Sequence, residues 1–171
     1  MHMTESRADA FDTFYRDTAR RLTRYAYGLT GDPGEAQDLV QEAYARAWQR
    51  WRRLAGYDDP EAWLRLVVNR LSSDRWRRIG VRRARAAATA AAPPVAPPSE
   101  NTVLLVGAMR TLPADQRRAL ALHYLLDRSV ADVAAELGVA EGTVKSWLSR
   151  GRTALAAALS PVVAQGARDA R

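Results

Sequence analysis

The side chains best suited to bind another macromolecule lie near the C-terminal end of the chain, where hydroxyl groups and cations occur close together. On one face of a helix, such groups can donate hydrogen bonds to the base edges and phosphates of duplex DNA. The segment 129–148 predicts the helix pair that presents them, because its spacings are those of a helix-turn-helix. The residues that we expect to contact DNA are Thr143, Lys145, Ser146, Trp147, Ser149, Arg150 and Arg152.

The residues ahead of this face predict how the two helices are held. Ser129 and Asp132 stand three apart and can form a capping box, Ala134 is small where the helices would cross, and Gly138 can take a left-handed turn. The second helix is expected over about 141–159, lying across the major groove. The alternative is an ordinary helical hairpin with a solvated basic face. Trp147 can pack on the neighbouring helix or lie against thymine methyls and sugars.

A second group of cations lies in the middle of the chain. Between Arg75 and Ser99 there are six arginines and no acidic residue, in a chain whose formal net charge is +7. Arginine stays charged at neutral pH, so this run can hold phosphates. The run is equally compatible with the solvated end of a basic helix.

The composition gives almost no support to catalysis. The chain has no cysteine and two histidines, which excludes disulfides, thiolate metal sites and cysteine nucleophiles. No nucleophile, acid/base pair or phosphate-binding loop occurs at a meaningful spacing. We therefore expect a protein that is not an enzyme and that uses no metal, no cofactor and no small-molecule substrate.

Two observations bear on the compartment. No apolar run approaches the roughly 18 residues that a membrane span requires. The first residues carry charges at Glu5, Arg7, Asp9 and Asp12, without the apolar core of a secretory signal. The sequence therefore predicts no membrane insertion and a cytoplasmic location.

The spacing of apolar residues predicts an all-α chain made of two small helical domains joined by a flexible linker. Apolar residues recur at three- and four-residue steps from Phe11 to Leu29, and Asp32 and Asp59, each followed by proline, predict the starts of two further helices. The Ala- and Pro-rich stretch 86–98 has little to bury and predicts a tether. We expect a first domain over 1–78, an Ala/Pro/Arg-rich linker over 79–100, a helix-turn-helix domain over 101–160 and a disordered tail over 161–171.

Motifs in both halves resemble one known family. The segments Asp38-Leu-Val-Gln41-Glu42 and Pro60-Glu-Ala-Trp63-Leu64 resemble region 2 of the extracytoplasmic-function sigma factors, the small two-domain promoter-specificity subunits of bacterial RNA polymerase. The second half, from Leu112-Pro113 through Gly142-Thr143-Val144, looks like their region 4. The resemblance implies a sigma factor that binds core polymerase and directs promoter-specific initiation.

The resemblance also implies partners and sites. In this family the Asp-Leu-Val-Gln-Glu segment lies against the clamp helices of the polymerase β′ subunit, which implies core-polymerase contacts from Asp38, Gln41 and Glu42. The implied partners are core RNA polymerase (β′ clamp helices and β flap), promoter DNA and an anti-sigma factor. The last helix would read the −35 duplex, and the first domain would hold the melted −10 strand. The residues implied for the −10 strand are Tyr57, Asp58, Asn69, Arg70, Arg75, Trp76, Arg77 and Arg78.

Several alternatives stay open from the residues alone. The segment around Asp38 also fits a solvated helix face, Trp63 fits the apolar stripe of its helix and is expected in the core, and Asn69 can make an internal hydrogen bond. Trp147 stands where many relatives carry arginine, which affects the −35 preference. Two rival functions remain: a stand-alone helix-turn-helix regulator that binds palindromic duplex sites, and a sigma-like protein that sequesters an anti-sigma factor.

Overall fold

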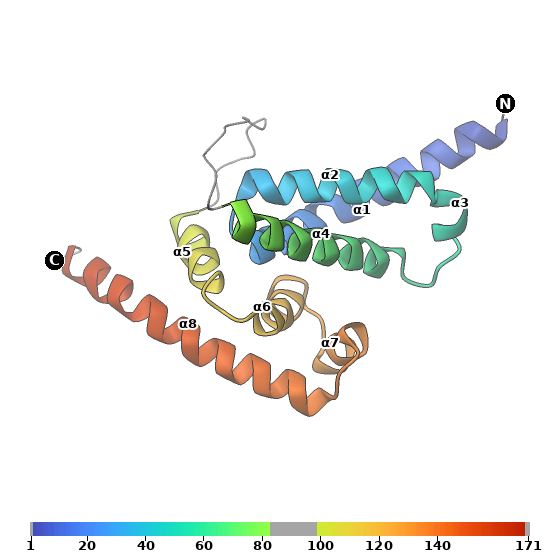
Figure 1. The fold of residues 1–171 in the computed structure, drawn as a ribbon. Helices are drawn as coiled ribbons and strands as arrows, with labels where there is room; N and C mark the ends of the chain where they lie inside the picture. Colours follow the sequence, from blue (N-terminus) through green and yellow to red (C-terminus); the bar gives the residue numbers. More distant parts are fainter. Residues whose placement is uncertain (1, 83–98, 170–171) are drawn as a thin grey trace. The chain divides into compact units, whose positions relative to one another are not determined.

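The computed structural model describes residues 2–82 and 99–169, and it describes side chains over 6–75, 77–78 and 99–161. The chain divides into two compact units, residues 1–93 and 94–171. Every regular element within the described ranges is helical (Figure 1). The all-α prediction is therefore confirmed.

The first unit contains the helices α1 (His2–Thr30), α2 (Pro33–Gln49), α3 (Trp51–Leu54) and α4 (Pro60–Arg82). Both predicted caps are present, since the Asp32 carboxylate accepts from the Glu35 amide at 2.7 Å and the Asp59 carboxylate accepts from the Ala62 amide at 2.9 Å. Gly31, at φ 74°, makes the turn between α1 and α2. The two aspartates thus fix where α2 and α4 begin.

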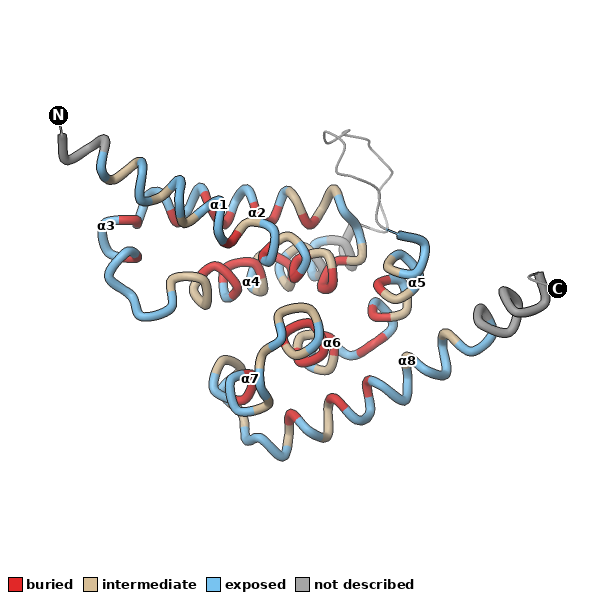
Figure 2. Tube along the Cα trace, turned by 180° about the vertical axis from the view of Figure 1, so that it is seen from behind, coloured by how far each residue is buried: buried red, intermediate tan, exposed pale blue. Residues whose placement is uncertain are grey.

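Helices α1, α2 and α4 pack against one another and share one core, seen as the buried inner stripes in Figure 2. Its fully buried side chains include Leu22, Tyr25, Leu39, Leu64 and Val68. Because burying each such side chain is worth about 1.5–3 kcal/mol, this shared face holds the three helices at a fixed spacing.

The N-terminal half of α1 is held by aromatic rings. Phe11 lies 5.1 Å from Trp48 and 5.1 Å from Trp51 between ring centroids, and Phe14 lies 5.0 Å from Trp51. The Arg7 guanidinium sits 4.7 Å from the Trp48 ring centroid and donates to the Trp48 carbonyl at 3.0 Å. These contacts hold the helix as far back as Arg7, ahead of the predicted start near Phe11, and α1 itself begins at His2.

The second unit contains α5 (Glu100–Met109), α6 (Ala114–Leu120), the π-helix η1 (Ala121–Leu125), α7 (Val130–Leu137) and α8 (Glu141–Asp169). Its core gathers side chains from all five of these elements: Val106, Leu120, Leu122, Val133, Val144 and Leu148. Helix α8 packs against α5, α6 and α7, so it is the element around which the unit is built.

The helix-turn-helix prediction is confirmed in its local geometry. The Ser129 hydroxyl accepts from the Asp132 amide at 3.0 Å, and the Asp132 carboxylate accepts from the Ser129 amide at 3.2 Å. Gly138 takes the left-handed conformation at φ 68°, ψ 36°. Gly151 of α8 lies so close to α6 that an added Cβ would stand 2.6 Å from a Leu120 methyl carbon.

Two features differ from the sequence expectations. The segment after Leu120 widens into the π-helix, where the apolar spacing predicts a regular helix. Helix α8 continues through Pro161 to Asp169, where the sequence predicts a helix end near Leu159 and a disordered tail. An alanine-rich stretch before Pro161 has high helix propensity, which favours the longer helix.

Candidate nucleic-acid interface

The predicted −35 residues all lie on the first turns of α8, which begins at Glu141. Val144 and Leu148 face the core at 0% and 3% exposure, so the residues between them turn outward. Lys145, Ser149, Arg150 and Arg152 are exposed, whereas Thr143, Ser146 and Trp147 are partly exposed. One face of α8 therefore offers hydroxyls and cations together, with the partly covered Trp147 among them.

One of these residues has a partner that the sequence does not suggest. The Arg152 guanidinium donates to the Tyr124 hydroxyl at 3.0 Å, across 28 positions of sequence. Tyr124 lies on η1 and is 50% exposed. Apolar spacing groups it with Leu120 and Leu122, so no sequence signal marks it as part of this surface.

In the first unit, the loop residues Tyr57 and Asp58 are exposed as expected for a binding loop. Tyr57 lines a pocket of about 340 Å³ together with Arg50, Arg53, Leu54 and Trp63. The Arg50 guanidinium lies 5.9 Å from the Trp63 ring centroid. The expectation that Trp63 is a core residue is wrong: it is partly exposed, because the pocket opens over its ring.

Sequence reasoning missed Arg50 and Arg53, which flank this aromatic pocket. The signal that could have found them is the alternation of arginine and aromatic residues over 48–53, ahead of the loop. An arginine beside an aromatic ring is a combination that single-stranded nucleic acid can use, through stacking on the ring and pairing with phosphate.

Asn69 is partly buried within α4, and the Tyr25 hydroxyl donates to its Oδ1 at 2.9 Å. The internal hydrogen bond that the sequence left open is therefore present. It occupies the carbonyl oxygen of the amide and fixes the direction in which the amide nitrogen points. Arg70, Arg77 and Arg78 are exposed further along the helix. The side chain of Trp76, also predicted to bind DNA, lies outside the described residues.

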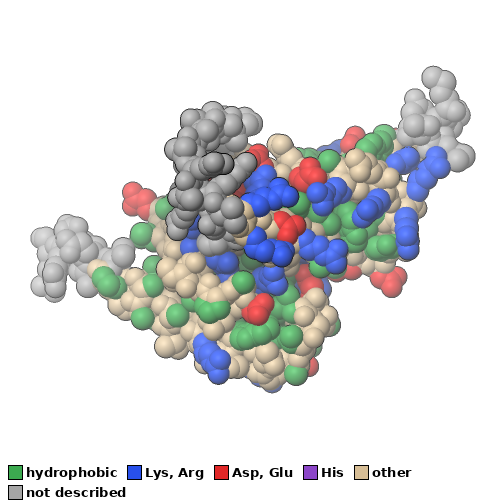
Figure 3. All heavy atoms as spheres, viewed as in Figure 1, with side chains coloured by type: hydrophobic (Ala, Val, Ile, Leu, Met, Phe, Trp, Pro, Cys, Tyr) green, Lys and Arg blue, Asp and Glu red, His purple; other side chains and the backbone are tan. Residues whose placement is uncertain are grey.

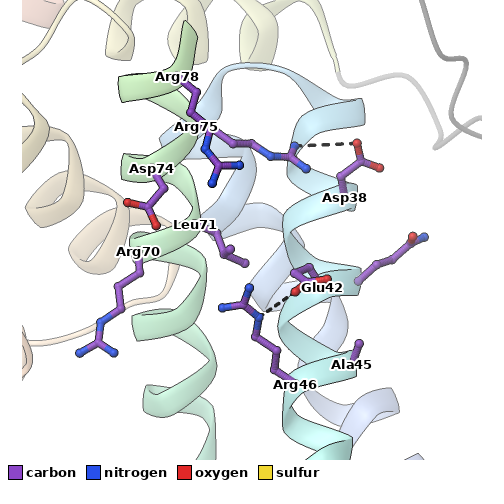
Figure 4. Close-up of a pocket in the computed structure, with 10 residues that line it drawn as sticks. Asp38, Glu42, Ala45, Arg46, Arg70, Leu71, Asp74, Arg75 and Arg78 are labelled. Atoms are coloured by element: carbon purple, nitrogen blue, oxygen red, sulfur yellow. Dashed lines mark hydrogen bonds and ion pairs between the residues drawn. The ribbon is translucent and has the colours of Figure 1, made fainter. Parts of the chain in front are cut away.

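The predicted polymerase-binding residues and several predicted DNA-binding arginines line one groove between α2 and α4 (Figure 4). The groove has a volume of about 620 Å³. Its ten lining residues are Asp38, Gln41, Glu42, Ala45, Arg46, Arg70, Leu71, Asp74, Arg75 and Arg78. Asp38, Gln41 and Glu42 are all exposed, so the part of α2 that the family motif covers faces outward.

Ion pairs already neutralise part of this groove. A carboxyl oxygen of Asp38 lies 3.8 Å from an Arg75 nitrogen, joining α2 to α4, and Glu42 pairs with Arg46 at 2.7 Å. Arg77 pairs with Asp74 at 2.6 Å. Figure 3 shows the result, with acidic side chains scattered among the basic ones on the face that α2 and α4 present.

A buried arginine secures the start of α4. Arg65 is 3% exposed and lies 3.2 Å from an Asp59 carboxyl oxygen and 3.7 Å from a Glu61 oxygen. Arg21 of α1 pairs with Glu61 at 2.8 Å, and this hydrogen bond raises the pKa of Arg21. The network ties the loop before α4 to α1, so it holds the loop that carries Tyr57 and Asp58.

Neither a membrane-spanning helix nor a metal-binding cluster occurs in the described ranges 2–82 and 99–169. No helix there is both long enough and apolar enough to cross a membrane. No three His, Asp or Glu side chains in these ranges are grouped so that they could hold a metal ion.

Comparison with known proteins gives matches over both units. The description "Sigma-70 region 2" matches residues 14–82, and "Sigma-70, region 4" matches residues 102–155. The chain is 35% identical over 141 residues to the ECF RNA polymerase sigma factor SigL of Mycobacterium tuberculosis, a match that covers 78% of this chain and 80% of that protein. It is 33% identical over 153 residues to the RNA polymerase sigma-E factor of Streptomyces antibioticus, covering 86% and 83%.

Two solved structures have a fold similar to that of this chain. The sigma factor RpoE from Bartonella quintana, in a co-crystal with the anti-sigma factor NepR, aligns with a TM-score of 0.67 and 28% identity over 86% of this chain and 97% of that one. CnrH, in complex with the cytosolic domain of CnrY, has the same fold, with a TM-score of 0.61 at 21% identity over 90% of each chain.

Proposed function

The chain belongs to the extracytoplasmic-function sigma factors of the sigma-70 family, and from this premise we propose which of its residues bind the polymerase and the promoter. It is an RNA polymerase sigma factor, a subunit that selects the sites where transcription begins. We assign all bond-making chemistry to the polymerase and none to this chain. Residues 1–78 are assigned to core and −10 binding, 101–160 to −35 binding, and 79–100 to the linker.

The −35 duplex is assigned to the outer face of α8. This assignment is supported by the exposed donors Lys145, Ser149, Arg150 and Arg152 beside the buried Val144 and Leu148. A recognition helix contacts base edges with its N-terminal residues and phosphates further along. Thr143, Ser146 and Trp147, partly covered at the start of α8, are assigned to the base edges or to the sugars beside them.

The melted −10 strand is assigned to the Tyr57 pocket and to α4. Tyr57 and Trp63 supply ring surfaces for stacking, and Arg50 and Arg53 supply cations around the same 340 Å³ pocket. Asn69 supports the assignment as well. Its Oδ1 is taken by Tyr25, which leaves the amide nitrogen as an oriented donor for a base edge. Asp58, Arg70, Arg75, Trp76, Arg77 and Arg78 complete the proposed −10 set.

Core polymerase is assigned to Asp38, Gln41 and Glu42 on α2. Their support is exposure: all three point away from the core, whereas the intervening Leu39 and Val40 are buried. Two carboxylates and an amide on one exposed helix face complement a basic surface such as that of the family's clamp helices.

An anti-sigma factor is a further proposed partner. RpoE of Bartonella quintana was crystallised with the anti-sigma factor NepR. A sigma factor of the same family and fold offers the same kind of surface to a regulator, so we propose that this chain is held in an inactive complex until a signal releases it.

The experiment that tests the assignment is run-off transcription from a genomic promoter library, using bacterial core polymerase with and without the full chain. New start sites that share two motifs at a fixed spacing are expected. The Arg150→Ala chain should keep the −10 motif and lose preference at the −35 motif. An unchanged −35 profile in Arg150→Ala would remove α8 as the reading helix. Tight binding of the free chain to palindromic duplex DNA, without polymerase, would favour a stand-alone regulator.

A further inference from the structure

Tyr124 belongs to no motif, yet it is exposed and tied to the recognition helix. Its hydroxyl accepts a hydrogen bond from the Arg152 guanidinium at 3.0 Å, and half of its surface is open to solvent. The two residues come from different elements, η1 and α8. They converge because α6, which runs into η1, packs along α8 (Figure 1).

Tyr124 lies in the π-helix η1 and is 50% exposed, whereas Leu120 just before η1 is 2% exposed in the core. Turns of this kind occur often at functional sites. His123 anchors the turn, because its Nδ1 lies 2.7 Å from the Arg128 carbonyl oxygen, and the ring of Tyr124 packs edge-on against His123 at 4.8 Å.

The direction of the hydrogen bond determines what the pair can bind. Arginine only donates, so the tyrosine oxygen is the acceptor and its own O–H proton remains available. The guanidinium keeps further N–H donors, and Arg152 forms no ion pair with a carboxylate in the described part of the chain. Two adjacent outward groups therefore offer donors and a positive charge to one oxygen-rich anion.

The position along α8 favours a phosphate over a base edge. Arg152 stands eleven residues after Glu141, or about 16 Å along the helix axis at 1.5 Å per residue. Base edges are contacted from the start of a recognition helix, whereas residues this far along meet the sugar-phosphate backbone. We propose that Tyr124 and Arg152 form a binding site for one backbone phosphodiester of the −35 duplex, with Tyr124 both orienting Arg152 and donating its hydroxyl proton. This inference rests on the proposed −35 role of α8.

The test uses holoenzyme assembled from core polymerase and the full chain, with a promoter obtained from the run-off library. Single phosphates across the −35 duplex are replaced by uncharged methylphosphonates, and affinity is measured for each duplex. With the wild-type chain, we expect one position whose neutralisation weakens binding about tenfold, the size of one charge-assisted hydrogen-bonded contact. Tyr124→Phe and Arg152→Ala should each weaken binding to the unmodified duplex. Arg152→Ala should become insensitive to neutralisation at that same position, and Tyr124→Phe, which loses one donor but keeps the cation, should respond to it less than the wild type does.

Two controls separate a binding role from a structural one. Tyr15→Phe removes the hydroxyl of another exposed tyrosine, 46% exposed on α1, and should leave the phosphate profile unchanged. Tyr124→Phe keeps the ring, so its thermal unfolding should match that of the wild type. Because the phenylalanine variant keeps Arg152, only Arg152→Ala should flatten the salt dependence of binding, by about one phosphate contact.

The failures are distinguishable. If Tyr124→Phe loses affinity equally at every duplex and responds to the same phosphate as strongly as the wild type, or if its unfolding shifts, the phosphate site is refuted while α8 keeps its −35 role. If no −35 phosphate matters to the wild-type holoenzyme and Arg150→Ala is also without effect, the proposed −35 function of α8 fails, and the phosphate site fails with it.

Discussion

Replacing Gly151 with alanine tests the helix crossing that positions the recognition helix. An alanine Cβ would lie 2.6 Å from Leu120 Cδ1 and 3.3 Å from Leu120 Cγ, closer than methyl groups pack, and both residues are buried. Either Leu120 or the axis of α8 must move. Overpacking of this kind costs about 1–3 kcal/mol, whereas alanine gains about 1 kcal/mol over glycine in a helix interior. We expect a net loss of stability of up to about 2 kcal/mol.

Gly107→Ala is the matched control. Gly107 lies in α5 of the same unit, and no atom stands within 4 Å of the position its Cβ would take. This variant should show only the gain in helix propensity, about 0.5–1 kcal/mol. The difference between the stability changes of the two variants measures the cost of the clash with Leu120.

The measurement is native-state hydrogen exchange of the amides of α8, which reports the second unit without interference from the first. The decisive comparison repeats Gly151→Ala in a chain that already carries Leu120→Ala. Leu120→Ala alone should cost about 2–5 kcal/mol, but Gly151→Ala should then become stabilising, because its methyl group enters the vacated space. If Gly151→Ala stabilises the wild-type chain as much as Gly107→Ala does, or acts identically in both backgrounds, the close crossing is not a constraint.

Four further outcomes are expected. Arg65→Ala, which removes the 3%-exposed cation between two carboxylates, should destabilise the first unit by about 2–3 kcal/mol in urea titration; an unchanged midpoint would contradict this. Burial raises the pKa of Tyr44 to about 12, above the ordinary value of about 10 that it has in the unfolded chain. The free energy of unfolding should therefore be constant below pH 10 and fall by roughly 2–3 kcal/mol as pH rises to 12. Tyr44→Phe, which has no hydroxyl to ionise, should abolish this loss. Ser129→Ala should cost about 1 kcal/mol. Because hydrogen bonds from Ser129 lower the pKa of Asp132, the stability that the ionised Asp132 carboxylate contributes should be lost as pH falls through that lowered pKa, and the variant should lose less, as acid titration would measure. Asn69→Asp keeps the acceptor for Tyr25 but removes the amide donors, so permanganate probing of promoter opening should fall while the unfolding midpoint holds.

The parts of the fold that the sequence predicts are the local ones. The caps at Asp32, Asp59 and Ser129 and the turn at Gly138 depend on residues within a few positions of one another, and all of them are present. The π turn after Leu120 is different, because its apolar residues satisfy a regular helix equally well. The contacts of η1 with α7, and the hydrogen bond of His123 with the Arg128 carbonyl, depend on the tertiary fold, which no local pattern encodes.

The candidate site divides in the same way. The exposed face of α8 follows from helical periodicity once Val144 and Leu148 are assigned to the core, so its residues can be identified from sequence. The pairing of Arg152 with Tyr124 and of Asp38 with Arg75 depends on distances between elements, which periodicity does not supply. Trp63 shows the limit most clearly, since its apolar spacing predicts a core position while the pocket beside it stays open.

These pairings change how the net charge of +7 should be understood. In the first unit, Arg75 and Arg77 already face the carboxylates of Asp38 and Asp74, so binding a phosphate there exchanges one anion for another. Exposed pairs of this kind are worth only about 0–1 kcal/mol, which makes the exchange possible but reduces its net gain. Arg150 and Arg152 of α8 have no such partner in the described residues, so each phosphate bound there releases counterions in full. Arg75 and Arg77 should therefore contribute less to the salt dependence of promoter binding than Arg150 and Arg152 do, which alanine substitution of each arginine across a salt series would measure.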